Sequence, residues 1–229
     1  MRQTIRNKVA ASLPPALATT VKNSWRIIRH PIILTTVDEV VRQSTAEELE
    51  TPWWNRRAIR YLSGHLRPGA RAFEWGSGGS TVWLARRGVS VTSIEHDPEW
   101  VEKVIDRCPT ADVRCVPGTT QGKLRAEPQH RNAFKLEDKG QYFFDDYVAA
   151  IDSFGEDSLD IVIVDGMCRI ECVRQGTPKV KPGGVLVVDD TDYRFVDPEK
   201  LLPGWQAVSL WGYKKTQDLR ETTFFHRPK

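Results

Sequence analysis

The sequence predicts an α/β domain with a doubly wound, mostly parallel, seven-stranded sheet that ends in an antiparallel closing strand. From residue 51 onward, short β-branched runs alternate with helical patterns, as in units that join parallel strands through helices. The run Asp160–Val164 is apolar after its first residue, which suits a strand buried on both faces. Two late β-like runs, joined by a polar segment, suit an antiparallel pair. With 229 residues, 40% of them hydrophobic, the chain can bury a sizeable core, which excludes wholesale disorder.

The helices and strands are expected in a regular order. A first helix is predicted to begin at Thr51-Pro52, because threonine caps helices and proline suits the first helical position, and to run to about Leu66. Two further helices are expected over Ser80–Arg87 and Pro98–Arg107. The expected strands, in chain order, are Arg71–Trp75, Ser90–Glu95, Asp112–Val116, Asp160–Val164, Gly184–Val188, Ala207–Trp211 and Thr222–His226.

Residues 1–50 are predicted to form a basic, helical amino-terminal extension, and residues 51–229 to form the main domain. Residues 1–37 carry six Lys or Arg and no Asp or Glu. The segment Trp25–Arg29 mixes basic and apolar residues, which fits either a peripheral helix on the main domain or a helix that contacts a membrane surface or a partner. The peripheral helix is the favoured interpretation, so we expect residues 1–37 to be dispensable for folding.

The charge and the cysteine content limit the partners and the compartment. The chain has 33 basic and 30 acidic residues, and a formal charge of +3 is too balanced for a dedicated nucleic-acid binder. Four cysteines do not make a disulfide scaffold, which favours a reducing, cytoplasmic compartment, membrane-peripheral if residues 1–37 bind a membrane surface. Cys168 and Cys172 lie one helical turn apart, but Cys108 and Cys115 do not complete a zinc spacing. We therefore expect no zinc site.

The segment Phe73–Thr81, Phe-Glu-Trp-Gly-Ser-Gly-Gly-Ser-Thr, carries the strongest indication of a bound ligand. A predicted strand runs into a glycine turn and a helix begins directly after it, so backbone amides at the helix start can bind an anionic or polar group. The Gly-x-Gly-x-x-Gly motif of dinucleotide-binding proteins requires its third glycine at Thr81, whose Cβ would crowd the helix against the strand. An acid, Glu74, stands two residues before the first glycine.

A second acid, Glu95, ends the next predicted strand, 21 residues beyond Glu74. Nucleotide-binding sheets place a carboxylate there against the ribose hydroxyls, because a carboxylate accepts two hydrogen bonds from a vicinal diol. His96 follows Glu95 and is expected to neighbour the site rather than to catalyse. An ordinary exposed loop acid is the alternative interpretation of Glu95.

These residues resemble a known family. The arrangement Glu74-x-Gly76-x-Gly78-x-Ser80 is similar to the first motif of class I S-adenosylmethionine-dependent methyltransferases, which have a Rossmann-like fold. The resemblance covers roughly residues 52 to 227 and fits a poorly characterised branch without an implied substrate. It implies that the loop passes under the methionine part of S-adenosylmethionine and that the acid helps to hold its amino group. The cofactor-binding residues expected on these grounds are Glu74, Trp75, Gly76, Ser77, Gly78, Ser80, Glu95, His96 and Asp165.

Three acids follow the fourth and fifth expected strands: Asp165 after the fourth, and Asp189 and Asp190 after the fifth. Ligands of open parallel sheets bind outside the carboxyl ends of the strands, so these three carboxylates are the expected catalytic residues. Catechol-type O-methyltransferases have Asp and then Asp-Asn at these places and bind a divalent metal there. The likeness implies a Mg²⁺ site, with Asp190 where the family has Asn. Without a metal, Asp165 is expected to act as a general base or to line the cofactor pocket, and the other two acids to cap turns or contact solvent.

Two further features are expected on the acceptor side. Arg169 is the candidate substrate-binding residue, because a guanidinium can bind a carboxylate or phosphate through two parallel hydrogen bonds. The alternative for Arg169 is a structural role, paired with Glu171 or Asp192. The polar, basic stretch from Gly118 to Gln141 has no clear period and is predicted to be a surface loop that shapes the acceptor side.

The leading functional hypothesis is therefore an enzyme of the EC 2.1.1 class that transfers a methyl group from S-adenosylmethionine to an oxygen of a small molecule or glycan. Two alternatives stay open. An NAD-type oxidoreductase is opposed by Thr81 and Glu74. A non-catalytic cofactor-binding protein at a membrane surface or in a complex is supported only by the basic amino-terminal segment.

Overall fold

The computed structural model describes residues 51–125, 142–194, 201–214 and 219–229. The predicted extension over residues 1–50 and most of the predicted acceptor-side loop lie outside these residues. The structure therefore leaves the predictions made for residues 1–37 as they stand.

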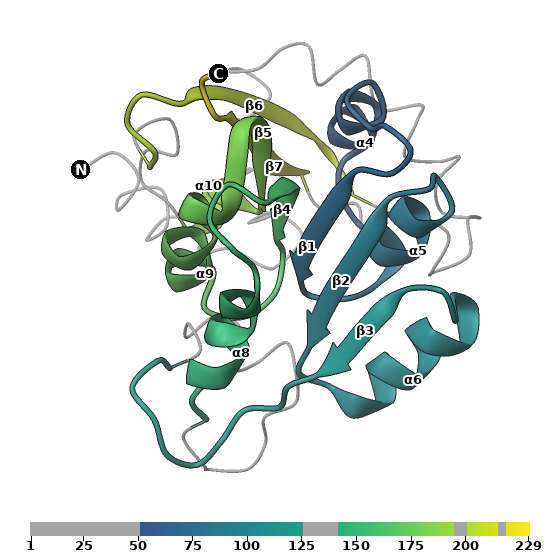
Figure 1. Cartoon of the computed structure of the whole chain (residues 1–229), viewed down its shortest axis with the longest axis vertical. Coiled ribbons are helices and arrows are strands. Elements are labelled where there is room, and N and C mark those ends of the chain that lie inside the picture. The colour runs from purple at the N-terminus through teal and green to yellow at the C-terminus, as the bar shows by residue number, and fades with distance from the viewer. Residues whose placement is uncertain (1–50, 126–141, 195–200, 215–218) are drawn as a thin grey trace, which may run out of the picture.

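The described residues form one seven-stranded sheet with the order β3-β2-β1-β4-β5-β7-β6 (Figure 1). Its strands are β1 (Arg71–Trp75), β2 (Ser90–Glu95), β3 (Asp112–Cys115), β4 (Leu159–Val164), β5 (Val180–Asp189), β6 (Gln206–Tyr213) and β7 (Leu219–His226). Neighbouring strands are parallel from β3 to β5, and β7 runs antiparallel to both β5 and β6. The predicted fold class is confirmed.

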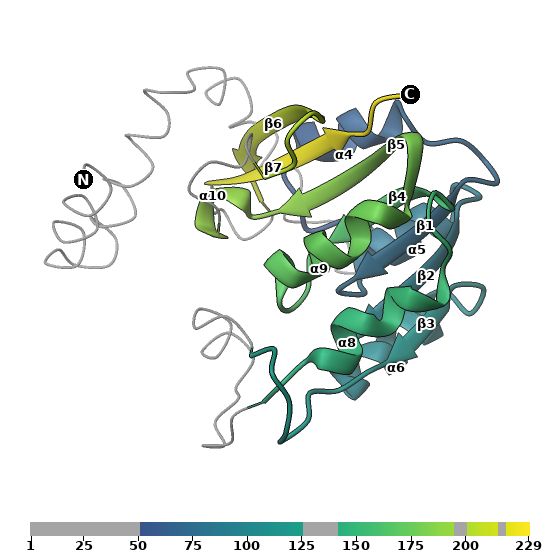
Figure 2. The ribbon, with the colours of Figure 1, turned by 60° about the vertical axis from the view of Figure 1, so that its left-hand side comes forward.

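Helices cover both faces of the sheet, as Figure 2 shows from the side. They are α4 (Arg56–Ser63), α5 (Gly79–Ala85), α6 (Pro98–Arg107), α8 (Asp145–Ala149), α9 (Arg169–Gly176) and α10 (Thr191–Arg194), with short 3₁₀ turns over Ala150–Ser153 and Thr177–Lys179. Alternate residues of a strand point to opposite faces. Phe73 and Trp75 accordingly pack with α8 and α9, whereas Ala72 packs on the opposite face with α4 and α5.

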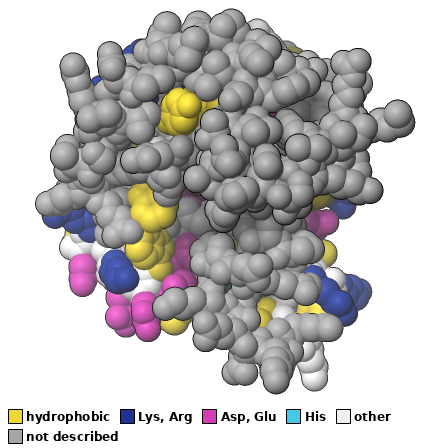
Figure 3. Space-filling view, turned by 180° about the vertical axis from the view of Figure 1, so that it is seen from behind, with side chains coloured by type: hydrophobic (Ala, Val, Ile, Leu, Met, Phe, Trp, Pro, Cys, Tyr) yellow, Lys and Arg dark blue, Asp and Glu magenta, His cyan; other side chains and the backbone are white. Residues whose placement is uncertain are grey.

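The start of helix α6 and the face that it buries both follow from its local sequence. Asp97 caps it by accepting hydrogen bonds from the backbone amides of Glu99 and Trp100, and a proline occupies the first helical position. Val101 and Val104 are buried. Seen from behind, acidic and basic side chains lie interspersed at the edge of the molecule that carries this helix (Figure 3). The helix therefore presents an apolar stripe to the sheet and charges to solvent.

The predicted start of the first helix is wrong. Helix α4 begins at Arg56, not at Thr51-Pro52, because the Asn55 side chain is the cap and accepts a hydrogen bond from Ala58 N at 3.0 Å. Asn55 also donates to Leu210 O on β6 and to Thr222 Oγ1 on β7, which fixes the start of the helix against the sheet. The helix ends at Ser63.

The structure gives one result on membrane-spanning helices and one on the cysteines. Within the described ranges, none of the helices combines the length and apolarity needed to cross a bilayer. All four cysteines are free thiols, and the cytoplasmic location stays a prediction.

Candidate active site at the carboxyl ends of the strands

The glycine turn between β1 and α5 is fixed at its first glycine by the fold itself. Gly76 has a φ of +95°, and its amide donates to Ile94 O at 2.8 Å. A Cβ at this position would lie 2.9 Å from the carbonyl carbon of Asp165 and 2.9 Å from Gly166 N. Glycine is required here because both the backbone conformation and the contact with the loop after β4 exclude a side chain.

The second glycine of the turn is different. A Cβ at Gly78 would meet only Trp100 Nε1, at an ordinary contact distance of 3.7 Å. Trp100 holds the turn from outside, since its indole donates to Ser77 O at 2.7 Å. Packing among the described residues therefore does not require glycine at position 78, whereas the close approach of a ligand to the backbone would require it.

Glu74 is fully buried at the base of this turn. Its Oε2 atom accepts hydrogen bonds from Thr81 Oγ1 at 2.5 Å and from Ser93 Oγ at 2.9 Å. Its Oε1 atom is buried and has no hydrogen-bond partner among the described residues. Burial raises the pKa of Glu74 to about 7, although the hydroxyl groups that donate to it oppose this rise. An unpaired, buried carboxyl oxygen is costly unless a ligand group pairs with it.

Thr81 occupies the position where a dinucleotide motif would have its third glycine. Its side chain is fully buried, accepts a hydrogen bond from Gly78 N at 3.0 Å and donates to Glu74. The threonine hydroxyl thus links the acid to the turn, which a glycine cannot do. The dinucleotide interpretation is not favoured by this arrangement.

Glu95 and His96 lie where β2 ends. Glu95 is buried, which excludes the ordinary exposed acid. Its Oε1 atom accepts hydrogen bonds from the amides of His96 and Asp97 and faces His96 Nδ1 at 2.5 Å. The carboxylate is therefore held firmly through Oε1.

The remaining predicted residues of the turn play unequal parts. Ser77 and Ser80 are buried, and Ser77 Oγ lies 2.8 Å from Ser93 Oγ, so this hydroxyl belongs to the hydrogen-bond network around Glu74. The Trp75 side chain is fully buried in the core, and its indole donates to Tyr147 O. Any contact of Trp75 with a cofactor would thus come from its backbone, not from a side chain that walls a pocket.

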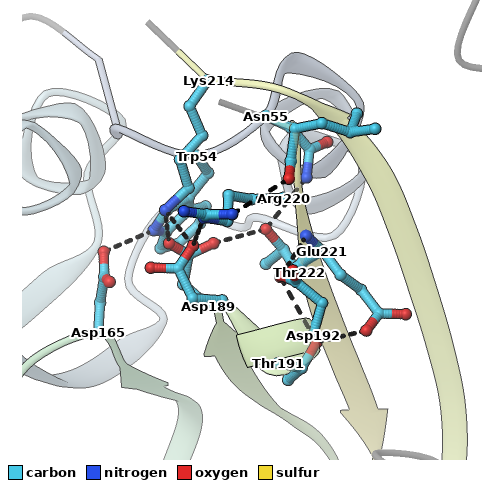
Figure 4. Close-up of polar contacts among 12 residues, drawn as sticks. Trp54, Asn55, Asp165, Asp189, Thr191, Asp192, Lys214, Arg220, Glu221 and Thr222 are labelled. Carbon is cyan, nitrogen blue, oxygen red and sulfur yellow. Dashed lines mark hydrogen bonds and ion pairs between the residues drawn. The ribbon is translucent and has the colours of Figure 1, made fainter. Parts of the chain in front are cut away.

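The three predicted acids come together at the carboxyl ends of β4 and β5, which are parallel neighbours. Ligand atoms of Asp165, Asp189 and Asp190 lie within 4.8 Å of one another, and among the described residues these acids form the group of carboxylates that could hold a metal ion. The residues that contact these three acids were not predicted from the sequence. Figure 4 shows Trp54, Lys214, Arg220 and Thr222 around Asp165 and Asp189.

The three carboxylates differ in access and in charge. Asp189 is fully buried, accepts a 2.7 Å hydrogen bond from Thr222 Oγ1 and pairs with Lys214 Nζ. Burial raises the pKa of Asp189, and the ammonium of Lys214 opposes this rise. For Asp190, burial also acts against the charged form, but the attraction of Lys214 outweighs it and holds the pKa well below its usual range. The side chains of Asp165 and Asp190 are 20% and 19% exposed, so only these two can meet an acceptor.

Arg169 is a structural link between two strand ends. Its three guanidinium nitrogens donate to the backbone carbonyls of Gly166, Asp189 and Asp165 at 3.0, 2.5 and 2.7 Å, and Nη2 also lies 3.0 Å from Asp165 Oδ1. The side chain is buried, and its donors point into the protein. These contacts with backbone carbonyls and with Asp165 favour the structural alternative.

Lys214 and Arg220 reach this edge because of the strand order. Since β7 runs antiparallel to β5, its first residues and the end of β6 lie beside the carboxyl end of β5. Lys214 directly follows β6, and Arg220 is the second residue of β7. No spacing in the sequence indicates that Lys214 meets Asp189, 25 residues earlier, or that Arg220 approaches Asp190.

The chain matches one known family model and shares its fold with several solved structures. A family model described as a methyltransferase domain matches residues 73–191. No curated protein matches the sequence significantly.

Several solved structures share the fold at low sequence identity. An O-methyltransferase from Bacillus cereus, in complex with S-adenosylhomocysteine, is 16% identical over 84% of this chain and 90% of that chain, with a TM-score of 0.53. The O-methyltransferase TomG from Streptomyces achromogenes, involved in tomaymycin synthesis and in complex with S-adenosylmethionine, is 19% identical over 86% and 90% of the two chains, with a TM-score of 0.52. A methyltransferase-like protein from Silicibacter pomeroyi is 20% identical over 78% and 91%, with a TM-score of 0.50.

Proposed function

The chain belongs to the methyltransferase-domain family, and from this premise we propose that it transfers a methyl group from S-adenosylmethionine to an oxygen atom of a small molecule or glycan. The observation that carries the proposal is the unpaired Oε1 atom of Glu74 beside a turn in which Gly78 is not required by packing. S-adenosylmethionine has a cationic amino group that complements a buried carboxyl oxygen. The two similar O-methyltransferases bind this cofactor or its product, which supports the same ligand here.

The residues present fit S-adenosylmethionine at both ends of the proposed site. Glu74 would hold the amino group, and the turn at Gly76 and Gly78 would lie against the methionine part. Glu95 would bind the ribose hydroxyls through Oε2, since Oε1 is already used by its own loop. When bound, S-adenosylmethionine supplies the activated methyl group.

Asp165 is the residue that we assign to proton removal from the acceptor. Asp189 is sealed from solvent, so it cannot touch an acceptor. Asp190 is accessible, but its lowered pKa makes it a weak base. Asp165 is accessible and is held in position by two donors, Trp54 Nε1 on Oδ2 and Arg169 Nη2 on Oδ1. A general base held in this way can orient a hydroxyl and accept its proton.

The experiment measures formation of S-adenosylhomocysteine by the full chain with a panel of phenols, catechols and sugar hydroxyl acceptors. We expect acceptor-dependent turnover, and Asp165→Asn should lower kcat by about a hundredfold or more while the affinity for S-adenosylmethionine changes little. Asp160→Asn is the matched control, because Asp160 lies at the other end of β4 and pairs with Lys181.

Two results would each contradict one part of the proposal, the cofactor or the role of Asp165. Binding of NAD without binding of S-adenosylmethionine would restore the oxidoreductase alternative. Methyl transfer at the wild-type rate by Asp165→Asn would remove Asp165 from the reaction while leaving the cofactor assignment intact.

A further inference from the structure

Lys214 lies inside the carboxylate cluster rather than beside it. Its Nζ atom pairs with Asp189 Oδ2 (Figure 4). It also lies 2.7 Å from Asp190 Oδ1. The lysine side chain is only 12% exposed. The ammonium is therefore a buried part of the site, and it contacts carboxylate oxygens that a metal ion would need as ligands.

The third carboxylate is also satisfied by the protein. Asp165 Oδ2 accepts the Trp54 indole at 2.9 Å, and Asp165 Oδ1 lies 3.0 Å from Arg169 Nη2. Divalent cations such as Mg²⁺ and Ca²⁺ need several oxygen ligands at about 2.0–2.6 Å. To bind here, such an ion would have to displace an ammonium and two N–H donors from these oxygens.

The charges of the cluster lead to the same conclusion. Three carboxylates face three cations, because Arg169 and Arg220 approach Asp190 at 3.7 Å in addition to Lys214. Metal sites built from carboxylates keep an excess of negative charge for the ion. A divalent cation added to this compensated, largely buried cluster would leave two uncompensated positive charges, which is unfavourable at low dielectric.

We propose that the Lys214 ammonium takes the place of the divalent metal ion in this site, so that the protein supplies its own cation and does not bind Mg²⁺ there. The donor set therefore does not fit the Mg²⁺ that the resemblance implies. Lys214 acts as a positioning residue, since it holds Asp189 and Asp190 at the strand ends without touching an acceptor. The inference concerns cation binding and does not rest on methyl transfer.

Two lysine variants, one in the cluster and one outside it, test whether the Lys214 ammonium keeps a divalent cation out of the site. Lys214→Met removes the ammonium, keeps an unbranched side chain that is one heavy atom shorter, and leaves the three carboxylates one positive charge short. Lys181→Met is the control, because Lys181 pairs with Asp160 away from the cluster. The probe is Mn²⁺ alone, and the free-ion signal in electron paramagnetic resonance reports how much Mn²⁺ is bound by the full chain.

We expect the wild-type chain and Lys181→Met to leave Mn²⁺ free up to about 1 mM, the weak end of protein cation sites. We expect Lys214→Met to bind Mn²⁺ at least about tenfold more tightly than the wild type, and Asp165→Asn added to it to reverse the gain. Stoichiometric Mn²⁺ binding by the wild type that Asp165→Asn abolishes would overturn the proposal, as would a folded Lys214→Met without any gain. If Lys214→Met does not fold, Lys214→Gln serves for the comparison, and the wild-type titration decides on its own.

Discussion

The indole nitrogen of Trp54 donates a 2.9 Å hydrogen bond to Asp165 Oδ2, although the two residues are 111 positions apart in the chain. Trp54 is fully buried and precedes α4, and Asp165 follows β4. The segment that enters the domain thus fixes the acid that we assign to proton removal. Removing this donor should affect both the stability of the fold and the position of the carboxylate.

Trp54→Phe should lower the free energy of unfolding by about 2 kcal/mol, because it removes a hydrogen bond to a charged group together with buried volume. Urea unfolding measures this change. Trp53→Phe is the neighbouring control, since Trp53 is 40% exposed, and should change the free energy by no more than about 0.5 kcal/mol. Equal losses in the two variants would contradict the role given to the hydrogen bond.

Glu74→Gln should alter the pH dependence of stability. Burial raises the pKa of Glu74 from 4.5 to about 7, so the folded chain binds more protons at this group than the unfolded chain between those values. This group therefore makes the fold less stable as pH rises through that window, by roughly 1 kcal/mol per pH unit, and adds no further loss above it. Relative to the wild type, Glu74→Gln should gain stability from about pH 4.5 to pH 7 and then stay level. A difference that is constant across this range in urea unfolding would contradict the buried, unpaired carboxyl.

The two glycines of the turn should respond differently to alanine. Gly76→Ala should cost about 2 kcal/mol or more, because it forces a side chain into a positive φ and against the backbone after β4. Gly78→Ala should cost less than about 1 kcal/mol, since its Cβ meets only an ordinary contact. Thermal unfolding of both variants compares them directly, and a larger loss for Gly78→Ala would reverse the roles given to the two positions.

The strands could be predicted well because their signal is local. The bounds of β1 and β2 match the predicted ranges, and β3 and β4 differ by one residue, since short runs with apolar residues between turns specify strands without help from distant residues. Helices α8 and α9 were not predicted. They have 5 and 8 residues, and so short a segment shows little of the apolar period that identifies a helix.

The start of α4 was predicted wrongly because two capping signals compete there. Thr51-Pro52 has the composition of a helix start, but Asn55 can also cap a helix. The contacts of Asn55 with β6 and β7 determine that the helix begins after Asn55. Such contacts depend on the strand order, which the local pattern does not contain. Tertiary structure therefore overrides the local preference.

The carboxylate cluster could be predicted in part. Parallel neighbours bring Asp165 and Asp189 to one edge, and that inference needs only the positions of two strands. Lys214 could not be found in this way, because it reaches the edge through an antiparallel hairpin that crosses beside β5. The positions of the acids can thus be predicted from the sequence, whereas the lysine that compensates their charge is found only in the structure.

The most direct test of the account is calorimetric titration of S-adenosylmethionine into the wild-type chain and into Gly78→Val. A branched side chain at Gly78 fits an extended backbone and an open contact, so the variant should fold, and circular dichroism checks this. We expect stoichiometric binding by the wild type and a loss of at least about tenfold in affinity, or 1.4 kcal/mol, in the folded variant. Unchanged affinity in folded Gly78→Val would contradict the placement of the cofactor against this turn.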